Sequence, residues 1–294
     1  MSDYLGFLLD GSVAEKAFTA ILDWLEENKS SWDMLDLQQI SEESPMIRTN
    51  AGPNADDDWL IQRSEQDSCH FIKIPDSWDK VLARVGKKTR FNLRYYGRLL
   101  SKDFNSVEYC TFPPAPQLYS ASMPLSEWMQ AFFQLHQSRW EMIGEPAVAS
   151  DAERKDFLLE VAHRLADRGQ LFMVGLKLNG QLAAVNIGFA MKNRAYYYLG
   201  GFNPEYNKYS LGTVLLEHYI KQAQELGLKE FNLLSGNDTF KERWEAQSRR
   251  YYHLIIDHGS LRSRLAGVYR RIRRRIGHRT RRALNRINIR MQPD

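Results

Sequence analysis

The sequence of 294 residues has few cysteines and no long apolar run. Its two cysteines, Cys69 and Cys110, lie far apart and outside any metal-binding pattern, so neither a disulfide framework nor a zinc site is expected. No stretch of about eighteen apolar residues occurs, which excludes an ordinary transmembrane helix. The first residues, MSDYLGFLLDGSVAEKAF, lack the basic and apolar segments of a secretory signal. These absences predict a cytoplasmic protein with two reduced thiols.

Several catalytic signatures are also missing. The chain contains no G-x-x-x-x-G-K-[ST], no G-x-G-x-x-G and no G-x-S-x-G motif, which argues against nucleotide hydrolysis, a Rossmann cofactor and a serine hydrolase. Its seven histidines are scattered without the spacing of metal ligands. We therefore expect chemistry that needs no metal ion.

The chain does contain enough apolar material for a core. Hydrophobic residues make up 43% of it and aromatic residues 12%, with 14 Tyr and 14 Phe, which argues against disorder. A chain of this length forms either one large domain or two small ones.

The charge is unevenly distributed. The formal net charge of +4 combines −7 over residues 1–261 with +11 over residues 262–294, where twelve arginines accompany a single acid. Apolar residues recur at helical intervals from Leu261 to Met291, so residues 261–291 are predicted to form a basic amphipathic helix. Such a helix binds an anionic membrane surface, binds RNA, or packs on the acidic body of the same protein.

The most informative stretch runs from Tyr198 to Trp244. An apolar, aromatic strand at residues 194–202 leads into a polar loop, and a helix starts at Ser210-Leu211-Gly212-Thr213, closes at Gly227 and precedes a second strand at residues 229–234. The first N–H groups of a helix lack internal partners and lie at the positive end of its dipole, so a turn without bulky side chains can hold a phosphate. The residues concerned are Lys208, Ser210, Leu211, Gly212 and Thr213. The alternative is an ordinary capped helix start.

Two further helices carry candidate binding residues. The helix expected at residues 86–100 has an arginine every four residues, and these form a basic ridge of Arg90, Arg94 and Arg98. The ridge either binds an anionic ligand or an acidic glycan, or is a solvated face of the helix. In the helix expected at residues 125–140, His136 and Arg139 share one face. The imidazole is either a general base or a structural hydrogen-bonding group.

The remaining elements define the class of fold. A helix at residues 151–169 precedes strands at 171–178 and 181–190, which are joined by Asn179-Gly180, a strong signal for a hairpin. The first half shows helices and strands as well. The order of helices and strands along the chain predicts an α/β (α+β) protein.

These segments resemble the acyl-CoA-binding core of the GNAT acetyltransferase superfamily. More narrowly, YLGGFNPEYNKYSLGTVLL and LLSGNDTFKERW are similar to the CelD/BcsL-type branch, which is associated with cellulose and exopolysaccharide biosynthesis and is related to the Fem-type peptidyltransferases. That branch has a Ser-x-Gly turn before the helix and an Arg-Gly-(Asp)-Glu-x-Tyr-Lys-x-x-Trp run after the next strand. The residues that match the second run are Gly236, Lys241 and Trp244. Those that replace its Arg, Glu and Tyr are Ser235, Asp238 and Phe240.

The resemblance implies a GNAT-like fold, with a mixed central sheet flanked by helices and an acyl-CoA arm held between splayed strands. It suggests a partial GNAT-like half at residues 1–116, a complete acyl-CoA-binding GNAT domain at 117–258 and the basic tail at 259–294. The implied catalytic residues are His136, Asp238, Lys241 and Tyr198. The implied substrate-binding residues are Arg90, Arg94, Arg139, Trp140 and Trp244.

The function expected from this resemblance is that of an acyltransferase dependent on acetyl-CoA or another acyl-CoA. Its acceptor would be a sugar or an amine in cell-envelope or exopolysaccharide synthesis. A Fem-like transferase using aminoacyl-tRNA is the alternative enzyme, which the basic helix and tail would serve. A third hypothesis is a non-catalytic scaffold, bound through residues 261–291 to a polysaccharide synthase at the inner face of the membrane.

Overall fold

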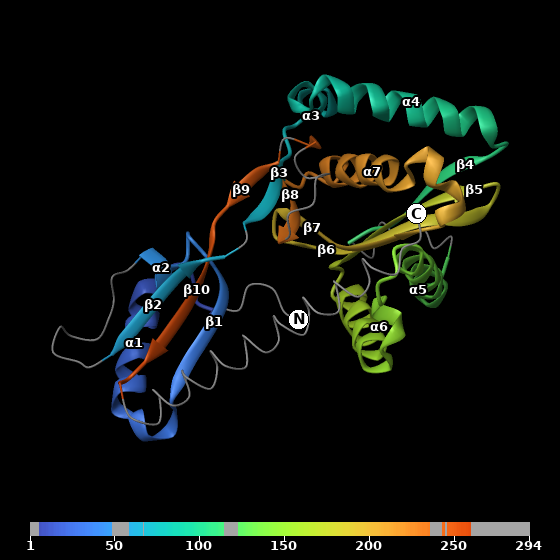
Figure 1. Cartoon of the computed structure of the whole chain (residues 1–294). Coiled ribbons are helices and arrows are strands. Elements are labelled where there is room, and N and C mark those ends of the chain that lie inside the picture. The colour runs from blue at the N-terminus through green and yellow to red at the C-terminus, as the bar shows by residue number, and fades with distance from the viewer. Residues whose placement is uncertain are drawn as a thin grey trace, which may run out of the picture. The chain divides into compact units, whose positions relative to one another are not determined.

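The computed structural model describes residues 6–48, 59–66, 68–114, 123–235, 243–244 and 246–259 (Figure 1). The chain divides into two compact units, one formed by residues 1–67 with 249–294 and the other by residues 68–248. The predicted basic tail at 261–291, Asp238 and Lys241 lie outside the described residues.

A seven-stranded mixed sheet is the centre of the larger unit. Its strand order is β4-β5-β6-β7-β8-β3-β9. The strands are β3 (Cys69–Lys73), β4 (Val107–Phe112), β5 (Leu171–Leu178), β6 (Gln181–Met191), β7 (Arg194–Phe202), β8 (Glu230–Ser235) and β9 (Gln247–Arg249). β4 to β7 form an antiparallel meander, and Asn179 and Gly180 take positive φ angles of 49° and 82° in the tight turn between β5 and β6. This sheet confirms the expected hairpin.

β7 and β8 run parallel and separate along their length. Their pairing covers three residue pairs, from Arg194↔Glu230 to Tyr196↔Asn232, while β7 continues to Phe202. The last residues of β7 are therefore not covered by this neighbour. The predicted splay between the strands at 194–202 and 229–234 is thus present.

Helices cover both faces of the sheet. On one face lie α3 (Trp78–Arg84), α4 (Lys87–Asp103) and α7 (Leu211–Glu225), and on the other α5 (Leu125–Met142) and α6 (Ala152–Asp167) (Figure 1). Successive side chains of a strand point to opposite faces, so Phe172 and Val174 of β5 join the α7 core while Met173 joins the α5 core. Short 3-10 helices precede α6 (Val148–Ser150) and α7 (Pro204–Tyr209). The mixed sheet flanked by helices confirms the expected fold class.

Gly201 of β7 allows α5 to pack directly on the sheet. A Cβ atom at this position would lie 2.4 Å from the backbone N of His136. We expect Gly201→Ala to lower the melting temperature in thermal unfolding, because two backbones would have to separate. Gly97→Ala in α4 is the matched control, since its Cβ would meet nothing within 4 Å, and alanine favours a helix interior. Equal melting temperatures for the two variants would contradict this.

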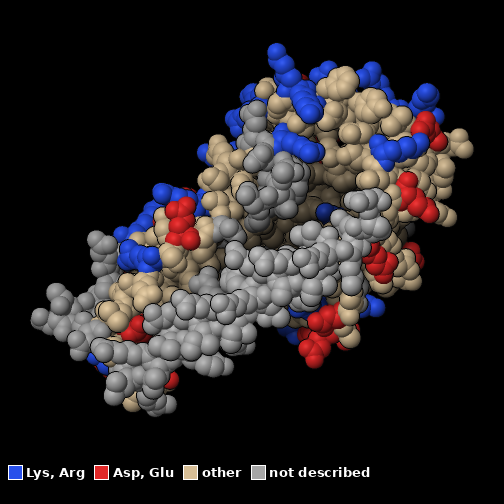
Figure 2. All heavy atoms as spheres, viewed as in Figure 1, with Lys and Arg blue, Asp and Glu red and all other residues tan. Residues whose placement is uncertain are grey.

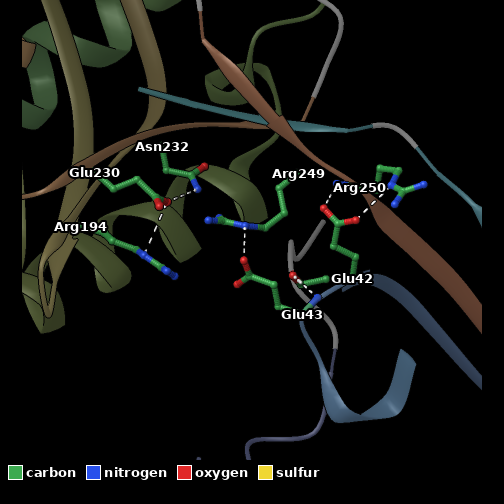
Figure 3. Close-up of polar contacts among 8 residues, drawn as sticks. Glu42, Glu43, Arg194, Glu230, Asn232, Arg249 and Arg250 are labelled. Carbon is green, nitrogen blue, oxygen red and sulfur yellow. Dashed lines mark hydrogen bonds and ion pairs between the residues drawn. The ribbon is translucent and has the colours of Figure 1, made fainter. Parts of the chain in front are cut away.

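The smaller unit has its own sheet and core. Its antiparallel strand order is β1-β10-β2, from β1 (Met34–Ser41), β2 (Leu60–Glu65) and β10 (Tyr251–Asp257). Its described residues form the helices α1 (Ala14–Glu27) and α2 (Pro45–Arg48), with a 3-10 turn at Lys29–Ser31. Phe18 and Leu22 of α1 pack with Ile40 and Leu254 of the sheet. Ion pairs join Arg250 to Glu42 at 3.0 Å and Arg249 to Glu43 at 3.5 Å (Figure 3).

This division differs from the boundary that the sequence suggested at residue 116. β3 pairs with β8 and β4 pairs with β5, so residues 68–114 contribute strands to the same sheet as the later elements. In turn, β10 pairs with β1 and β2 and returns to the first unit. Among the described residues, no helix combines the length and the apolar character that a membrane crossing requires.

Candidate functional site

A cavity of about 210 Å³ lies in the larger unit beside the uncovered end of β7. Parts of α4, α5, β6, β7 and the start of α7 contribute to its wall. The lining residues are Thr89, Arg139, Ala184, Asn186, Tyr197, Gly200, Gly201, Phe202, Asn207, Ser210, Leu211, Gly212, Thr213, Leu216, Arg243 and Trp244. Four of the five predicted cofactor-binding residues are among them, as are the predicted substrate-binding residues Arg139 and Trp244.

The first residues of α7 line this cavity. Ser210 takes a left-handed conformation (φ 51°, ψ 47°), and its carbonyl accepts from the N–H groups of Thr213 at 2.9 Å and Val214 at 3.3 Å. Within the described structure, the N–H groups of Leu211 and Gly212 have no such partner. A Cβ at Gly212 would meet nothing within 4 Å, so the approach to these groups is open. The helix start is suited to an anion.

The charged lining residues are cations. Arg139 and Arg243 line the cavity, and no carboxylate does so among the residues that the structure describes. Arg139 is fixed by a hydrogen bond of 3.1 Å from Nη1 to the carbonyl of Gly200. Its guanidinium also lies 5.3 Å from the ring of Phe202 and 5.9 Å from that of Trp140. An anionic ligand therefore meets favourable charge here, and a cationic one does not.

Tyr197 lines the cavity, whereas the predicted catalytic residue Tyr198 does not. The register between β6 and β7 shifts where Gly188 pairs with Tyr197 and Ile187 pairs with Leu199. Tyr198 is the extra residue of this bulge and is 36% exposed. A bulge of this kind reverses which side chains face the cavity. Assigning the faces of the strand by strict alternation along the sequence therefore selects the wrong tyrosine.

His136 is buried in the α5 core and does not line the cavity. Neither of its ring nitrogens has a hydrogen-bond partner in the described structure. Burial and, to a smaller extent, the charge of Arg139 lower the pKa of His136 to about 4. At neutral pH the ring is uncharged and enclosed. A general base must reach the proton of the acceptor, and in this arrangement the imidazole of His136 does not reach the cavity.

The buried histidine predicts a loss of stability in mild acid. Its pKa is about 4 when folded, against 6.5 for an ordinary histidine, so below pH 6.5 the unfolded chain binds the proton first. The stabilisation is complete above pH 6.5, declines as the pH falls toward 4, and amounts to at most about 3 kcal/mol. We expect His136→Gln to flatten this part of the pH dependence in urea titrations. An unchanged profile would show that other groups, such as His218, cause the loss.

Other predicted residues lie away from the cavity. Lys208 is held at 3.5 Å from Asp103, and its Nζ lies 4.7 Å from the ring of Tyr209. A hydrogen bond from Tyr209 and the charge of Lys208 lower the pKa of Asp103. Trp140 contacts the guanidinium of Arg139 and does not line the cavity.

The basic ridge also lies outside the cavity. Arg94 and Arg98 are exposed and Arg90 is half-buried. Two aromatic side chains of α4 accompany them, Phe91 at 61% and Tyr95 at 46% exposure, with nearly parallel rings. Figure 2 shows Lys and Arg side chains gathered over this helix. The ridge forms a separate outer surface.

Four polar lining residues, Thr89, Asn186, Asn207 and Arg243, were not predicted from the sequence, and the phenol at the cavity is that of Tyr197 and not of its neighbour Tyr198. Asn186 is a polar residue in an otherwise apolar strand, a signal that could have drawn attention to it. Within the described ranges, no three His, Cys, Asp or Glu side chains lie close enough together to hold a metal ion. The donor set of the cavity instead fits a phosphate-bearing ligand with carbonyl groups.

Comparisons with known proteins agree with this architecture. A sequence profile described as an acetyltransferase (GNAT) domain matches residues 87–242, more than half of the chain. No curated protein matches the sequence.

Among solved structures, FemX superimposes with a TM-score of 0.61 at 11% identity, covering 90% of this chain and 81% of that one. L-PGS from Bacillus licheniformis gives 0.56 at 15% identity, covering 90% and 80%. The C-terminal domain (DUF2156) of a protein described as a lysylphosphatidylglycerol synthetase, from Agrobacterium fabrum, gives 0.54 at 13% identity, covering 86% and 77%. At these identities the likeness concerns the fold alone.

Proposed function

The chain belongs to the acetyltransferase (GNAT) domain family, and from this premise we propose that it transfers an acyl group from acyl-CoA to an amine or hydroxyl acceptor. The observation that carries the proposal is the cavity at the start of α7. It combines two backbone N–H groups that have no partner in the described structure, an open Gly212 and two arginines, and no carboxylate is among the described lining residues. The CoA pyrophosphate would bind the helix start, and the acyl arm would follow β7 beyond its pairing with β8.

For the acceptor we propose a sugar or an amine of cell-envelope or exopolysaccharide synthesis. The support is the resemblance of the 198–244 segment to the CelD/BcsL-type branch. Asp238 and Lys241 would then orient the acceptor, and the basic ridge at Arg90 and Arg94, which lies outside the cavity, would bind anionic groups of a larger acceptor that extend beyond it. The basic tail at 261–291 would place the protein at an anionic membrane surface.

Calorimetric titration of the purified protein with acetyl-CoA and with longer acyl-CoAs tests the proposal. Saturable binding of one of them, followed by release of free thiol in the presence of a sugar or amine acceptor, is the expected result. Absence of binding for all of them would overturn the acyl-CoA assignment. The tail is tested separately, by sedimentation with vesicles of phosphatidylglycerol against vesicles of phosphatidylcholine.

A second candidate is an aminoacyl transferase that uses charged tRNA. Two observations favour it, namely the fold shared with FemX over 90% of the chain and the exposed cations and aromatic rings of α4. Arginines beside exposed aromatic rings suit a nucleic acid. Binding of charged tRNA that weakens steeply between 50 and about 200 mM salt, without acetyl-CoA binding, would select this function.

A non-catalytic scaffold is the third candidate. The substitutions Ser235 and Asp238 in the motif of the branch support it. Binding of acyl-CoA without turnover in the acceptor screen would favour this role.

A further inference from the structure

Asn186 of β6 carries a buried amide whose nitrogen makes no hydrogen bond to the residues that the structure describes. The residue is 4% exposed and lines the cavity. Its Nδ2 is enclosed and has no hydrogen-bond partner in the described structure. A buried amide N–H without a partner costs stability, and a ligand that supplies the acceptor would offset that cost.

The surroundings leave room for this amide. A Cβ at Gly200 would lie 2.5 Å from Oδ1 of Asn186 and 2.5 Å from Oη of Tyr197. The carbonyl of Gly200 accepts the hydrogen bond from Arg139. An amide, a phenol and a guanidinium therefore gather around one glycine on the wall of the cavity. All three side chains can donate hydrogen bonds, and among the described lining residues no carboxylate competes for them.

We propose that Asn186 binds the carbonyl oxygen of the acyl group, with its amide N–H as the donor. This assignment rests on the proposed acyl-CoA function and adds the residue that recognises the acyl carbonyl. The terminal torsion of an asparagine is broad and two-fold, so rotation exchanges Oδ1 and Nδ2 at the cavity wall.

In the transfer, the nitrogen or oxygen of the acceptor bonds to the carbonyl carbon and negative charge collects on the carbonyl oxygen. The C–S bond then breaks, and the CoA thiolate leaves and receives the proton that the acceptor loses. The Asn186 N–H stabilises the oxygen while it is charged. It is therefore a catalytic residue in this proposal, because it contacts the reacting group.

A pair of unreactive CoA thioethers tests the hydrogen bond without turnover. S-acetonyl-CoA carries a ketone, and S-propyl-CoA has a methylene in place of that carbonyl. We expect the wild-type protein to bind the ketone about 3- to 10-fold more tightly, which is the usual contribution of one neutral hydrogen bond. Asn186→Leu and Asn186→Ala should lose this preference. Asn186→Asp, which replaces the donor by a carboxylate, should reverse it.

Thermal unfolding of the free protein supplies a second readout and a matched control. Asn232 of β8 is also a buried asparagine, at 2% exposure, but its Nδ2 donates to Glu230 at 3.3 Å (Figure 3). Its Oδ1 accepts from the N–H of Leu234 at 2.9 Å. We expect Asn232→Leu to lower the melting temperature. Asn186→Leu should leave it unchanged or raise it, because in the described structure Nδ2 has no hydrogen bond to lose.

The outcomes separate this inference from the function on which it rests. If the wild-type protein binds neither thioether nor acetyl-CoA, the proposed function fails and the inference fails with it. If it binds acetyl-CoA but does not distinguish the two thioethers, only the inference fails. Retention of the preference by Asn186→Ala, or equal losses of melting temperature in the two leucine variants, would likewise overturn the role of Asn186.

Discussion

Gly212→Trp is expected to weaken acetyl-CoA binding by at least about 100-fold while the protein stays folded. Gly212 is exposed at the first turn of α7, and a Cβ there meets nothing within 4 Å, so the indole does not disturb the core. It does fill the space in front of the N–H groups of Leu211 and Gly212, where a phosphate would bind. Calorimetry with acetyl-CoA measures the loss, and circular dichroism checks the fold.

A matched variant separates blocking from a general effect of tryptophan. Gly97→Trp in α4 places the same side chain on another helix with equally open space. It lies outside the cavity, so acetyl-CoA affinity should stay at the wild-type value. Gly212→Ala is a milder test, since its small methyl favours the helix and leaves most of the turn accessible. If Gly212→Trp bound acetyl-CoA as tightly as the wild-type protein does, the phosphate would not bind at the start of α7.

Local patterns in the sequence were sufficient for most elements of the larger unit. The expected helix from the Ser210 turn to Gly227 is α7, Leu211–Glu225, and Gly227 takes a positive φ of 75° just beyond it. The strands at 171–178 and 194–202 have the predicted bounds. Periodicity and turn residues determine such features over short distances, so a single sequence reveals them.

Pairing between distant segments was not predictable in the same way. β2 at 60–65 and β10 at 251–257 were not predicted from the sequence, and they form strands because β10 pairs with β2 on one side and with β1 on the other. Likewise, β3 enters the larger sheet beside β8, more than 150 residues along the chain. Such contacts depend on tertiary packing, which overrides local propensity.

The candidate site was predictable where it depends on a backbone feature and not where it depends on side-chain direction. The turn at 210–213 was identified because a helix start has a sequence signature. Tyr197 lines the cavity in place of the predicted Tyr198 because β7 has a bulge. His136 is buried because α5 approaches the sheet closely at Gly201. Both depend on how strands and helices pack, so the types of residue alone did not reveal them.

Arg139→Met is expected to lower acetyl-CoA affinity by about 10- to 100-fold and to raise the pKa of His136. The variant removes the guanidinium that the carbonyl of Gly200 holds at the cavity wall. A hydrogen bond from a charged group contributes about 1.5 to 3 kcal/mol, so its loss would weaken binding of the anionic ligand by the stated factor. The same charge is the smaller of the two causes of the low pKa of His136. Because burial is the larger cause, the pKa should rise above 4 yet stay below 6.5, as an NMR titration of the imidazole would measure.

Arg139→Lys separates the charge from the shape of the guanidinium. Lysine keeps a positive charge near His136, so the pKa of the imidazole should remain close to that in the wild-type protein. It lacks the planar group that bonds to Gly200 while lying against the rings of Phe202 and Trp140, so part of the affinity for acetyl-CoA should still be lost. If both variants bound acetyl-CoA as the wild-type protein does, Arg139 would serve only to join α5 to β7, and the anion would depend on the start of α7 and on Arg243.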